Sequence, residues 1–167
     1  QVPMGGGNVS PMILERLSRE PYRLTMRRGS ARIGTVPDAV QVGPKVCLIN
    51  KYSASDGDLF PWGFRALGLG KLIGTRTWGG IVGISGSLPY MDGTDIRVPF
   101  FTSFDPKTGS WIIENHGVDP DILIDNDPVK EWNGEDQQLD RAIQEVMKEL
   151  QNRKPLPGVP TPRDFSK

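Results

Sequence analysis

The sequence predicts a domain of mixed α/β class, and three observations lead to this prediction. In the first half of the chain, helix-like segments alternate with short apolar runs typical of buried strands. Strand-like segments then dominate between residues 81 and 114. An amphipathic helical stripe follows in residues 136–153. The chain has 167 residues, which is enough for one domain with its own core or for one lobe of a larger protein.

The N-terminal part predicts one helix followed by a long irregular segment. Ser10 is expected to be the N-cap and Pro11 the first helical residue, with the helix ending near Glu20. Residues 21–45 show weak periodicity and contain several glycines and prolines, so we expect this segment to be mostly loop.

The middle of the chain predicts a strand, a helix and a second strand. The apolar run VCLIN makes residues 45–50 a buried strand. Residues 58–67 are expected to form a helix, because Pro61 is tolerated in its first turn and Gly68 can end it. Residues 71–74 then form a second short strand.

The second half begins with a predicted hairpin whose turn lies at residues 91–94, Met-Asp-Gly-Thr. Strands are expected at residues 95–104 and 111–114, and a helix at residues 136–153. Residues 155–167 are rich in proline, so we expect an extended surface strap or a disordered end.

Composition excludes several classes of protein. The 20 basic and 20 acidic residues give zero net charge without a long basic run, which argues against nucleic acid as a partner. The longest apolar runs fall far short of the about 18 residues that a membrane span needs. A single cysteine, Cys47, excludes an internal disulfide framework and suits a reducing compartment, so we expect a cytoplasmic location. The abrupt start QVPMGGG indicates one part of a larger protein.

The stretch NKYSASDGDLF joins the first strand to the following helix, and two interpretations of it are open. Ser55 or Asp56 can cap the helix, which is a common arrangement. Alternatively, Ser55 is a nucleophile on a sharp turn, because the unpaired N–H groups and the positive dipole end of a helix suit a developing oxyanion. The N–H of Asp56 would then be one oxyanion donor.

The glycine-rich turn at residues 5–7 offers a second donor. Glycines before a helix free backbone amides for close approach by a substrate, and Gly6 or Gly7 could supply such an amide. The alternative is a plain turn that leads into a helix.

Four segments follow one another in order: GGGNVSPMILERL, NKYSASDGDLFPWGFRALGLGKLIGTRTWGG, IVGISG with MDGT, and IIENHGVDPDILIDNDP. Together they resemble the C-terminal catalytic core of tricorn-type serine peptidases, relatives of the carboxy-terminal processing proteases. The resemblance runs from about Gly5 to about Leu150. It implies a crotonase-like (ClpP/crotonase-type) α/β fold, with a mixed sheet and flanking helices, for a lobe that covers residues 1–154.

The resemblance implies a role for each matching position. Ser55, which directly precedes the first aspartate of the S-A-S-D-G-D pattern, corresponds to the nucleophile. The amide of Asp56 and a glycine of the turn correspond to the oxyanion hole; we favour Gly7 and keep Gly6 as the neighbouring choice. Glu114 corresponds to the acid that supports the base through a bridging serine, since a base needs an orienting group.

Two departures from the family pattern affect the base. Gly80 stands where the processing proteases have a lysine, so a Ser–Lys dyad is absent and the tricorn type is favoured. The histidine base of that type lies upstream of the glycine-rich turn, whereas the one histidine here, His116, lies downstream. The base is therefore expected outside this chain, or the polypeptide is inactive. A Ser55–His116–Glu114 triad is the alternative, because alternation along the expected strand puts His116 and Glu114 on one face.

Two further features have structural explanations that we favour. Cys47 lies in the middle of a strand with no base suggested nearby, so it is expected to be a small buried hydrophobe. A run of acids lacks the glycine and the bidentate glutamate of an EF-hand loop, so a solvated loop is preferred to a metal site. These acids are Asp119, Asp121, Asp125 and Asp127.

We therefore expect a serine peptidase lobe that hydrolyses peptides through an acyl-enzyme on Ser55 and needs no cofactor or metal. The resemblance implies a β-propeller and a PDZ domain elsewhere in the protein. It also implies homo-oligomers, often hexamers, that act on short peptides. Charge and apolar-run length, as described above, argue against nucleic acid and a membrane as partners. The alternative is a non-catalytic peptide-binding or scaffold module that keeps the fold without a base.

Overall fold

A computed structural model describes residues 6–161, and of residues 85–88 it describes the backbone alone. Gly5, the first residue of the predicted glycine turn, lies outside the described residues. The helices are α1 (Ser10–Ser18), α2 (Asp56–Ala66), α3 (Pro128–Trp132) and α4 (Gln137–Gln151). The strands are β1 (Arg23–Met26), β2 (Ile33–Val36), β3 (Val46–Ile49), β4 (Lys71–Gly74), β5 (Gly83–Pro89), β6 (Asp95–Phe101) and β7 (Ile122–Leu123).

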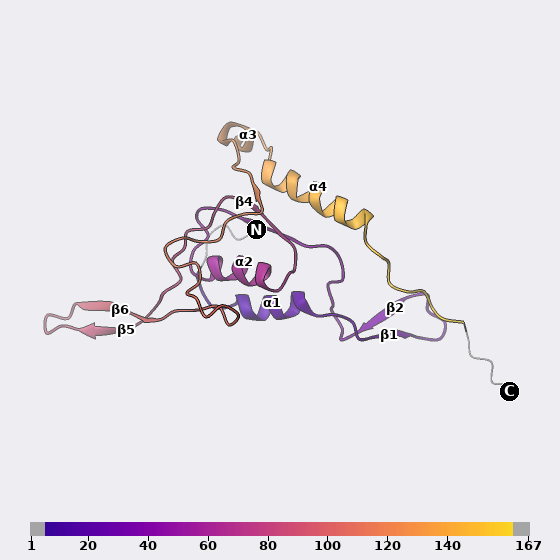
Figure 1. Ribbon diagram of the computed structural model, residues 1–167, viewed down its shortest axis with the longest axis horizontal. Coiled ribbons are helices and arrows are strands. Elements are labelled where there is room, and N and C mark those ends of the chain that lie inside the picture. Colours follow the sequence, from indigo (N-terminus) through magenta and orange to yellow (C-terminus); the bar gives the residue numbers. More distant parts are fainter. Residues whose placement is uncertain (1–5, 162–167) are drawn as a thin grey trace.

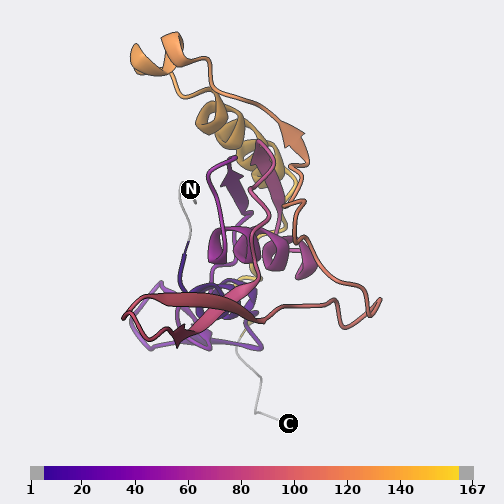
Figure 2. The ribbon, with the colours of Figure 1, turned by 90° about the vertical axis from the view of Figure 1, so that its left-hand side faces the viewer.

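A three-stranded parallel sheet with the strand order β3-β4-β7 lies between two layers of helices (Figure 1, Figure 2). Helices α1 and α2 lie on one side of the sheet and α4 on the other. In β3, Cys47 and Ile49 pack toward α1 and α2, whereas Leu48 packs toward Ala142 of α4. A strand covered on both faces has to be apolar on both, and this confirms the buried strand predicted at residues 45–50.

Two antiparallel hairpins extend from this body (Figure 1). Strands β5 and β6 form the predicted hairpin, and its turn is closed by the amide and hydroxyl of Thr94, which donate to Asp92 over 3.0 and 2.7 Å. Strands β1 and β2 form a second hairpin, so the prediction of mostly loop at residues 21–45 is wrong over these eight residues. Both strands are short and not fully buried on either face, which leaves little periodicity to detect.

The C-terminal segment lies beside the β1–β2 hairpin. Residues 157–160 and the two strands line a cavity of about 360 Å³. The last part of the predicted proline-rich strap, residues 162–167, lies outside the described residues. Within the described part of the chain, none of the helices has the length and apolar character needed to cross a membrane.

Several predicted boundaries need correction. Helix α1 begins at Ser10, but its N-cap is Val9, so Ser10 is the first helical residue and not the cap. The strand predicted at residues 111–114 does not form in the described chain, where a single bridge joins Phe104 to Trp111. Strand β7 and helix α3 were not predicted because each is too short to carry a periodic pattern.

Helix α4 confirms the helix predicted at residues 136–153, and the carboxylate of its N-cap Asp136 accepts from the Leu139 amide over 3.0 Å. The face of α4 that meets the sheet is largely polar: Gln138, Ala142 and Glu145 are buried. The apolar stripe that predicted the helix is largely exposed to solvent. Its exposed members are Leu139, Ile143, Met147 and Leu150.

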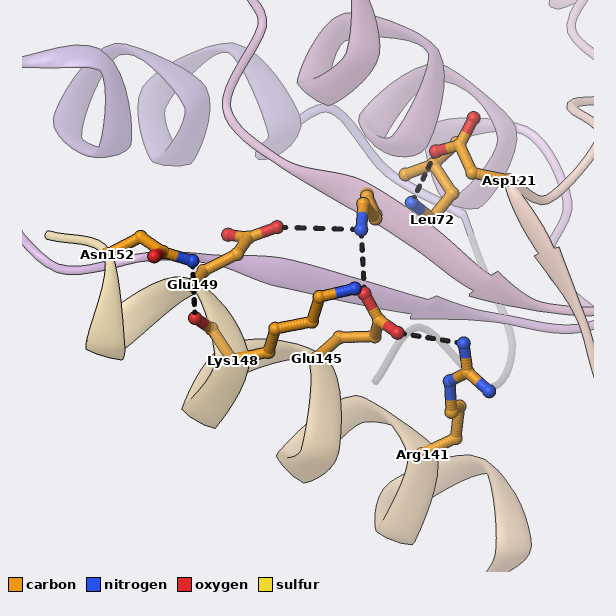
Figure 3. Close-up of polar contacts among 8 residues, drawn as sticks. Leu72, Asp121, Arg141, Glu145, Lys148, Glu149 and Asn152 are labelled. Atoms are coloured by element: carbon orange, nitrogen blue, oxygen red, sulfur yellow. Dashed lines mark hydrogen bonds and ion pairs between the residues drawn. The ribbon is translucent and has the colours of Figure 1, made fainter.

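An ion-pair cluster attaches α4 to the sheet (Figure 3). The Glu145 carboxylate accepts from Lys71 Nζ of β4 over 2.6 Å and from Arg141 over 2.8 Å. The Glu145 side chain is only 7% exposed, so both cations compensate a carboxylate that burial would otherwise destabilise. A charged cluster therefore takes the place that an apolar stripe usually has at a helix–sheet contact.

Candidate active site

Ser55 lies between β3 and α2, at the N-cap position of the helix. Its φ of 55° and ψ of −115° are rare for a residue with a side chain. The Ser55 amide donates to the Gly80 carbonyl over 3.1 Å, and its carbonyl accepts from the amides of Asp58 and Leu59 over 2.9 and 3.0 Å. The backbone is therefore held on both sides of the Ser55 side chain.

The Ser55 hydroxyl does not act as a helix cap. An ordinary N-cap serine accepts a hydrogen bond from an amide of the first helical turn. Ser55 occupies the cap position but makes no such bond within the described residues. Helix α2 begins at Asp56, two residues before the predicted start, so the Asp56 amide is one of its unpaired N-terminal donors. The geometry places a half-buried hydroxyl next to an available amide.

The carboxylate of Asp56 binds the N-terminus of α1. Its Oδ2 accepts from the amides of Val9 and Ser10, each over 3.0 Å, and its Oδ1 accepts from the Ser10 hydroxyl. Asp56 is 7% exposed and Ser10 is 4% exposed, so these bonds lie away from water. The side chain thus caps a helix that has no local side-chain cap.

The glycine turn that precedes α1 is brought next to the start of α2 by this contact. Gly7 has a φ of 119°, in a region that favours glycine, which fits its place in a sharp turn. Gly6, Asp56 and Gly57 all line one cavity of about 640 Å³, whose remaining walls are mostly apolar. The structure therefore brings together the two segments that the sequence assigns to an oxyanion hole.

Two carboxylates hold the four consecutive backbone amides of residues 79–82, the segment whose Gly80 carbonyl accepts from Ser55. Asp58, which is fully buried, accepts from Gly79 over 2.8 Å and from Gly80 over 3.2 Å. Glu114 Oε2 accepts from the next two amides over 2.7 and 2.9 Å. These are the amides of Ile81 and Val82.

Glu114 is connected to Ser55 through this segment, because the Gly80 carbonyl accepts from the Ser55 amide over 3.1 Å. The second oxygen of Glu114, Oε1, has no hydrogen-bond partner among residues 6–161. Ser55 and Glu114, which the sequence assigns to one site, therefore both hydrogen-bond to the same loop, at residues 80–82.

His116 does not join this group. The strand that would have aligned it with Glu114 is absent from the described chain, and Asn115 between them has a φ of 60°. His116 Nε2 lies 2.8 Å from Asp119 Oδ2, and the ring is exposed. It lines a cavity with Trp62, Gly63, Arg65 and Ala66 of α2, and Ser55 is not part of that lining. Among the described residues, His116 makes no hydrogen bond to Ser55 or Glu114, so the structure does not join the three residues of the alternative triad.

Cys47 behaves as the predicted buried hydrophobe. It is 5% exposed and belongs to the core between the sheet and helices α1 and α2. Burial raises the pKa of its thiol to about 11. Since the thiolate is the nucleophilic form, Cys47 is unsuited to nucleophilic catalysis.

The acidic run downstream of His116 has protein partners. Asp121 Oδ1 pairs with Arg65 over 2.8 Å, and its Oδ2 accepts from the Leu72 amide over 2.7 Å. Asp127 caps α3, where it accepts from the Val129 amide over 2.8 Å. Among the described residues, no group of three or more His, Cys, Asp or Glu side chains is placed to hold a metal ion.

Gly80 also shows why a lysine would not fit there without rearrangement. A Cβ atom at this position would lie 2.2 Å from the ring of Trp78. The ring would have to move before any side chain could occupy the position.

Comparisons with known proteins show the family of this chain. The sequence profile of peptidase family S41 matches residues 5–124. The tricorn protease of Thermoplasma volcanium is 42% identical over 153 residues, which are 90% of this chain and 14% of that protein. The tricorn protease of Thermoplasma acidophilum is 42% identical over 149 residues, again 14% of its length. The chain therefore belongs to peptidase family S41, and the resemblance seen in the sequence is confirmed.

Solved structures show the same relationship. The crystal structure of the tricorn protease superposes with a TM-score of 0.79 at 40% identity, over 89% of this chain and 14% of that chain. Mature CPAF complexed with lactacystin superposes with a TM-score of 0.55 at 23% identity, over 65% of this chain and 21% of that chain, which shows the fold alone. The chain spans about 14% of the length of the tricorn relatives, and its mixed α/β class is confirmed.

The side-chain contacts of Asp56 and Asp58 were not predicted from the sequence. Both acids were visible in the first turn of a helix, where a carboxylate usually serves the local amides. Their partners are instead 21 to 47 positions away. The glycine pair at residues 79 and 80 was the available signal, since backbone amides that become buried in a turn need acceptors.

Proposed function

We propose that this chain is the catalytic lobe of a serine peptidase that hydrolyses peptides through an acyl-enzyme on Ser55. The single observation that carries this proposal is the conformation of Ser55. Its φ of 55° and ψ of −115° at a strand-to-helix turn display a hydroxyl that caps no helix among the described residues. Strained residues of this kind are maintained where function needs them.

The reaction proceeds in two halves. Ser55 Oγ attacks the scissile carbonyl carbon while its proton passes to a base, and the oxyanion is held by the amides of Asp56 and Gly7, with Gly6 as the neighbouring choice. The amine leaves with the proton from the base, and an ester on Ser55 remains. Water, deprotonated by the same base, then attacks the ester and releases the acid.

The base belongs to a part of the protein outside residues 1–167. This is supported by the side chain of His116, whose Nε2 lies 2.8 Å from Asp119 Oδ2 and which makes no hydrogen bond to Ser55 among the described residues. Glu114 is anchored through Oε2, and its Oε1 is available to a hydroxyl that would orient an incoming histidine. This arrangement supports Glu114 as the group that acts through a bridging serine.

The family resemblance supports a proposal about the larger protein to which this lobe belongs. We propose a crotonase-like fold in a larger cytoplasmic protein that also carries a β-propeller and a PDZ domain and forms homo-oligomers. The apolar cavity beside Gly6 and Asp56 supports peptides with uncharged side chains as substrates. Lys45 and Asp56 are the charged residues of its lining, and the Asp56 carboxylate is already engaged.

A fluorophosphonate probe tests the nucleophile directly. The full-length protein and the 167-residue chain are each incubated with the probe, and the adduct is located by mass spectrometry. We expect a label on Ser55 in the full-length protein alone, and none in a Ser55→Ala variant. Ser53, two residues away and fully buried, is an internal control that should stay unlabelled.

Each other outcome contradicts a defined part of the proposal. A label on another serine of the full-length protein would show that Ser55 is not the nucleophile. A label on Ser55 in the 167-residue chain would place the base inside it. No label on the full-length protein, with the probe shown to be reactive on a known serine peptidase, would leave a non-catalytic peptide-binding module.

A further inference from the structure

Asp56 touches both halves of the proposed oxyanion hole. Its amide stands at the start of α2 next to Ser55, as one donor. Its carboxylate accepts from the amides of Val9 and Ser10 over 3.0 Å each, and Asn8 alone separates these residues from the glycine turn that supplies the other donor. One residue therefore links two segments that are 47 positions apart in the sequence.

The contact differs from an ordinary helix cap in two respects. A cap usually comes from the residue that immediately precedes the helix, but Val9 at that position offers no side-chain bond to α1. The capping group instead comes from α2 and is 7% exposed, so its bonds to the amides are charge-assisted and shielded from water. These bonds therefore cap the N-terminus of α1 and also fix its distance from the start of α2.

Gly7 precedes Val9 by two residues, so the Gly7 amide can lie at most about 7 Å from the Val9 amide that Asp56 holds. The turn is left without stiffness of its own, since a glycine has the widest choice of backbone angles. The clamp at Val9 and Ser10 is what limits where the Gly7 amide can lie relative to the Asp56 amide.

We infer that Asp56 is a positioning residue whose carboxylate sets the spacing between the two oxyanion donors. The inference rests on the proposed function. Donors to an oxyanion act over a narrow range of distance, and a displacement of about 1 Å can cost about 100-fold in rate. Loss of the clamp should therefore weaken transition-state binding while leaving ground-state binding of the peptide in place.

The test uses the full-length protein and four variants: Asp56→Ala, Asp56→Asn, Ser10→Ala and Asp136→Ala. Asp136 is the matched control, because it also caps a helix with its carboxylate but lies on α4, away from Ser55. The readouts are kcat, KM and the affinities for a peptide aldehyde and for the corresponding peptide alcohol. The aldehyde forms a tetrahedral adduct with a serine, and its oxygen enters the hole, whereas the alcohol binds as a ground state.

We expect Asp56→Ala to lower kcat and aldehyde affinity by about 10- to 100-fold, with KM and alcohol affinity within about threefold of wild type. Asp56→Asn should recover most of this loss, because its oxygen can accept both amides and its NH₂ can donate to the Ser10 hydroxyl. Ser10→Ala removes the hydroxyl bond to the Asp56 carboxylate but keeps both amide bonds. It should therefore lose only about 3- to 10-fold in aldehyde affinity. Asp136→Ala should lower Tm without changing the aldehyde-to-alcohol ratio.

Three results would overturn the inference. The first is an aldehyde-to-alcohol ratio in Asp56→Ala that equals that of Asp136→Ala. The second is no recovery by Asp56→Asn. The third covers an Asp56→Ala variant that does not fold: because Ser10→Ala removes one of the three bonds to the Asp56 carboxylate, an unchanged aldehyde-to-alcohol ratio in Ser10→Ala then decides against the positioning role. If the wild type itself neither turns over peptides nor binds the aldehyde, the proposed function fails and this inference with it.

Discussion

At the scale of single residues, Ser55 holds a backbone conformation that costs on the order of 1–3 kcal/mol for a residue with a side chain. Backbone hydrogen bonds maintain this conformation. The Ser55 amide donates to the Gly80 carbonyl, and the Ser55 carbonyl accepts from the amides of Asp58 and Leu59. None of them uses the hydroxyl. Ser55→Ala should therefore keep the turn and remove only the chemical group, which makes it a suitable control for labelling.

Cys47 provides a residue-scale prediction. Because its pKa is raised to about 11, only on the order of one thiol in a thousand is ionised at pH 8. We expect iodoacetamide at pH 8 to leave Cys47 unmodified in the native protein and to modify it fully in urea. Mass spectrometry of the peptide that contains Cys47 gives the measurement. Rapid native modification would show that the β3 core is open.

Candidate site residues stand out in the sequence where the local pattern carries the information, and their roles stay predictions. The small and acidic residues after an apolar run located Ser55, and resemblance located Glu114. The carboxylate contacts of Asp56 and Asp58 could not be found in this way, since their partners lie in other segments. A local pattern shows that a turn exists but not which distant amides face it.

At the scale of elements, α4 shows how charge can replace apolar packing. Glu145 is buried between Lys71 and Arg141, and Ala142 provides the close apolar contact with the sheet. Periodicity predicted the helix correctly. It could not predict which face turns inward, because that depends on Lys71, 74 positions away from Glu145.

The attachment of α4 should depend on pH in both directions. The bond to Lys71 holds the pKa of Glu145 below its ordinary value of 4.5, so this stabilisation is present above about pH 4.5 and is lost as pH falls through the lowered pKa. The same bond holds the pKa of Lys71 above its ordinary 10.5, so its stabilisation is present below that pH and is lost as pH rises through the raised pKa. Stability from this cluster is therefore greatest between the two.

Glu145→Gln tests this dependence. We expect the variant to lose Tm at neutral pH and to show a shallower fall in Tm between pH 6 and pH 3 than the wild type. Glu149→Gln is the matched control, because Glu149 lies 3.9 Å from Lys71 and is more exposed, so its removal should change little. Thermal unfolding of the 167-residue chain across this pH range gives the measurement. Parallel curves for Glu145→Gln and wild type would contradict the assignment.

Long or apolar elements were predicted well and short exposed ones poorly. Strands β3 and β4 and helices α1, α2 and α4 each have enough apolar periodicity to be found. The β1–β2 hairpin is held mainly by its backbone pairing, in which Thr25 lies opposite Gly34. Backbone pairing of this kind leaves no mark on side-chain pattern, so the hairpin could not be predicted.

At the scale of the whole molecule, the layered arrangement follows from one short run. The four residues of β3 are apolar on both faces, which requires helices on both sides of the sheet (Figure 2). The sequence order of strand, helix and strand then makes β3 and β4 parallel neighbours, as observed. The fold class was predictable for this reason. The two projecting hairpins lie outside this layered arrangement, so the fold class does not specify them.

The proposed site joins four separate segments of the chain, and this has a consequence for how it forms. The carboxylates of Asp56, Asp58 and Glu114 reach partners 47, 21 and 33 positions away. Each closed loop costs conformational entropy that is recovered only when the contact is made. The site should therefore be assembled late in folding, after the local helices exist.

The same feature predicts the order of loss in denaturant. In a urea titration of the full-length protein, peptidase activity should disappear at a lower concentration than the one that exposes Cys47 to iodoacetamide, because opening one loop suffices for the first and the core must open for the second. Coincident transitions would contradict this order. The long-range clamps thus make the catalytic geometry a sensitive reporter of partial unfolding: the chain can keep its core and already have lost the arrangement around Ser55.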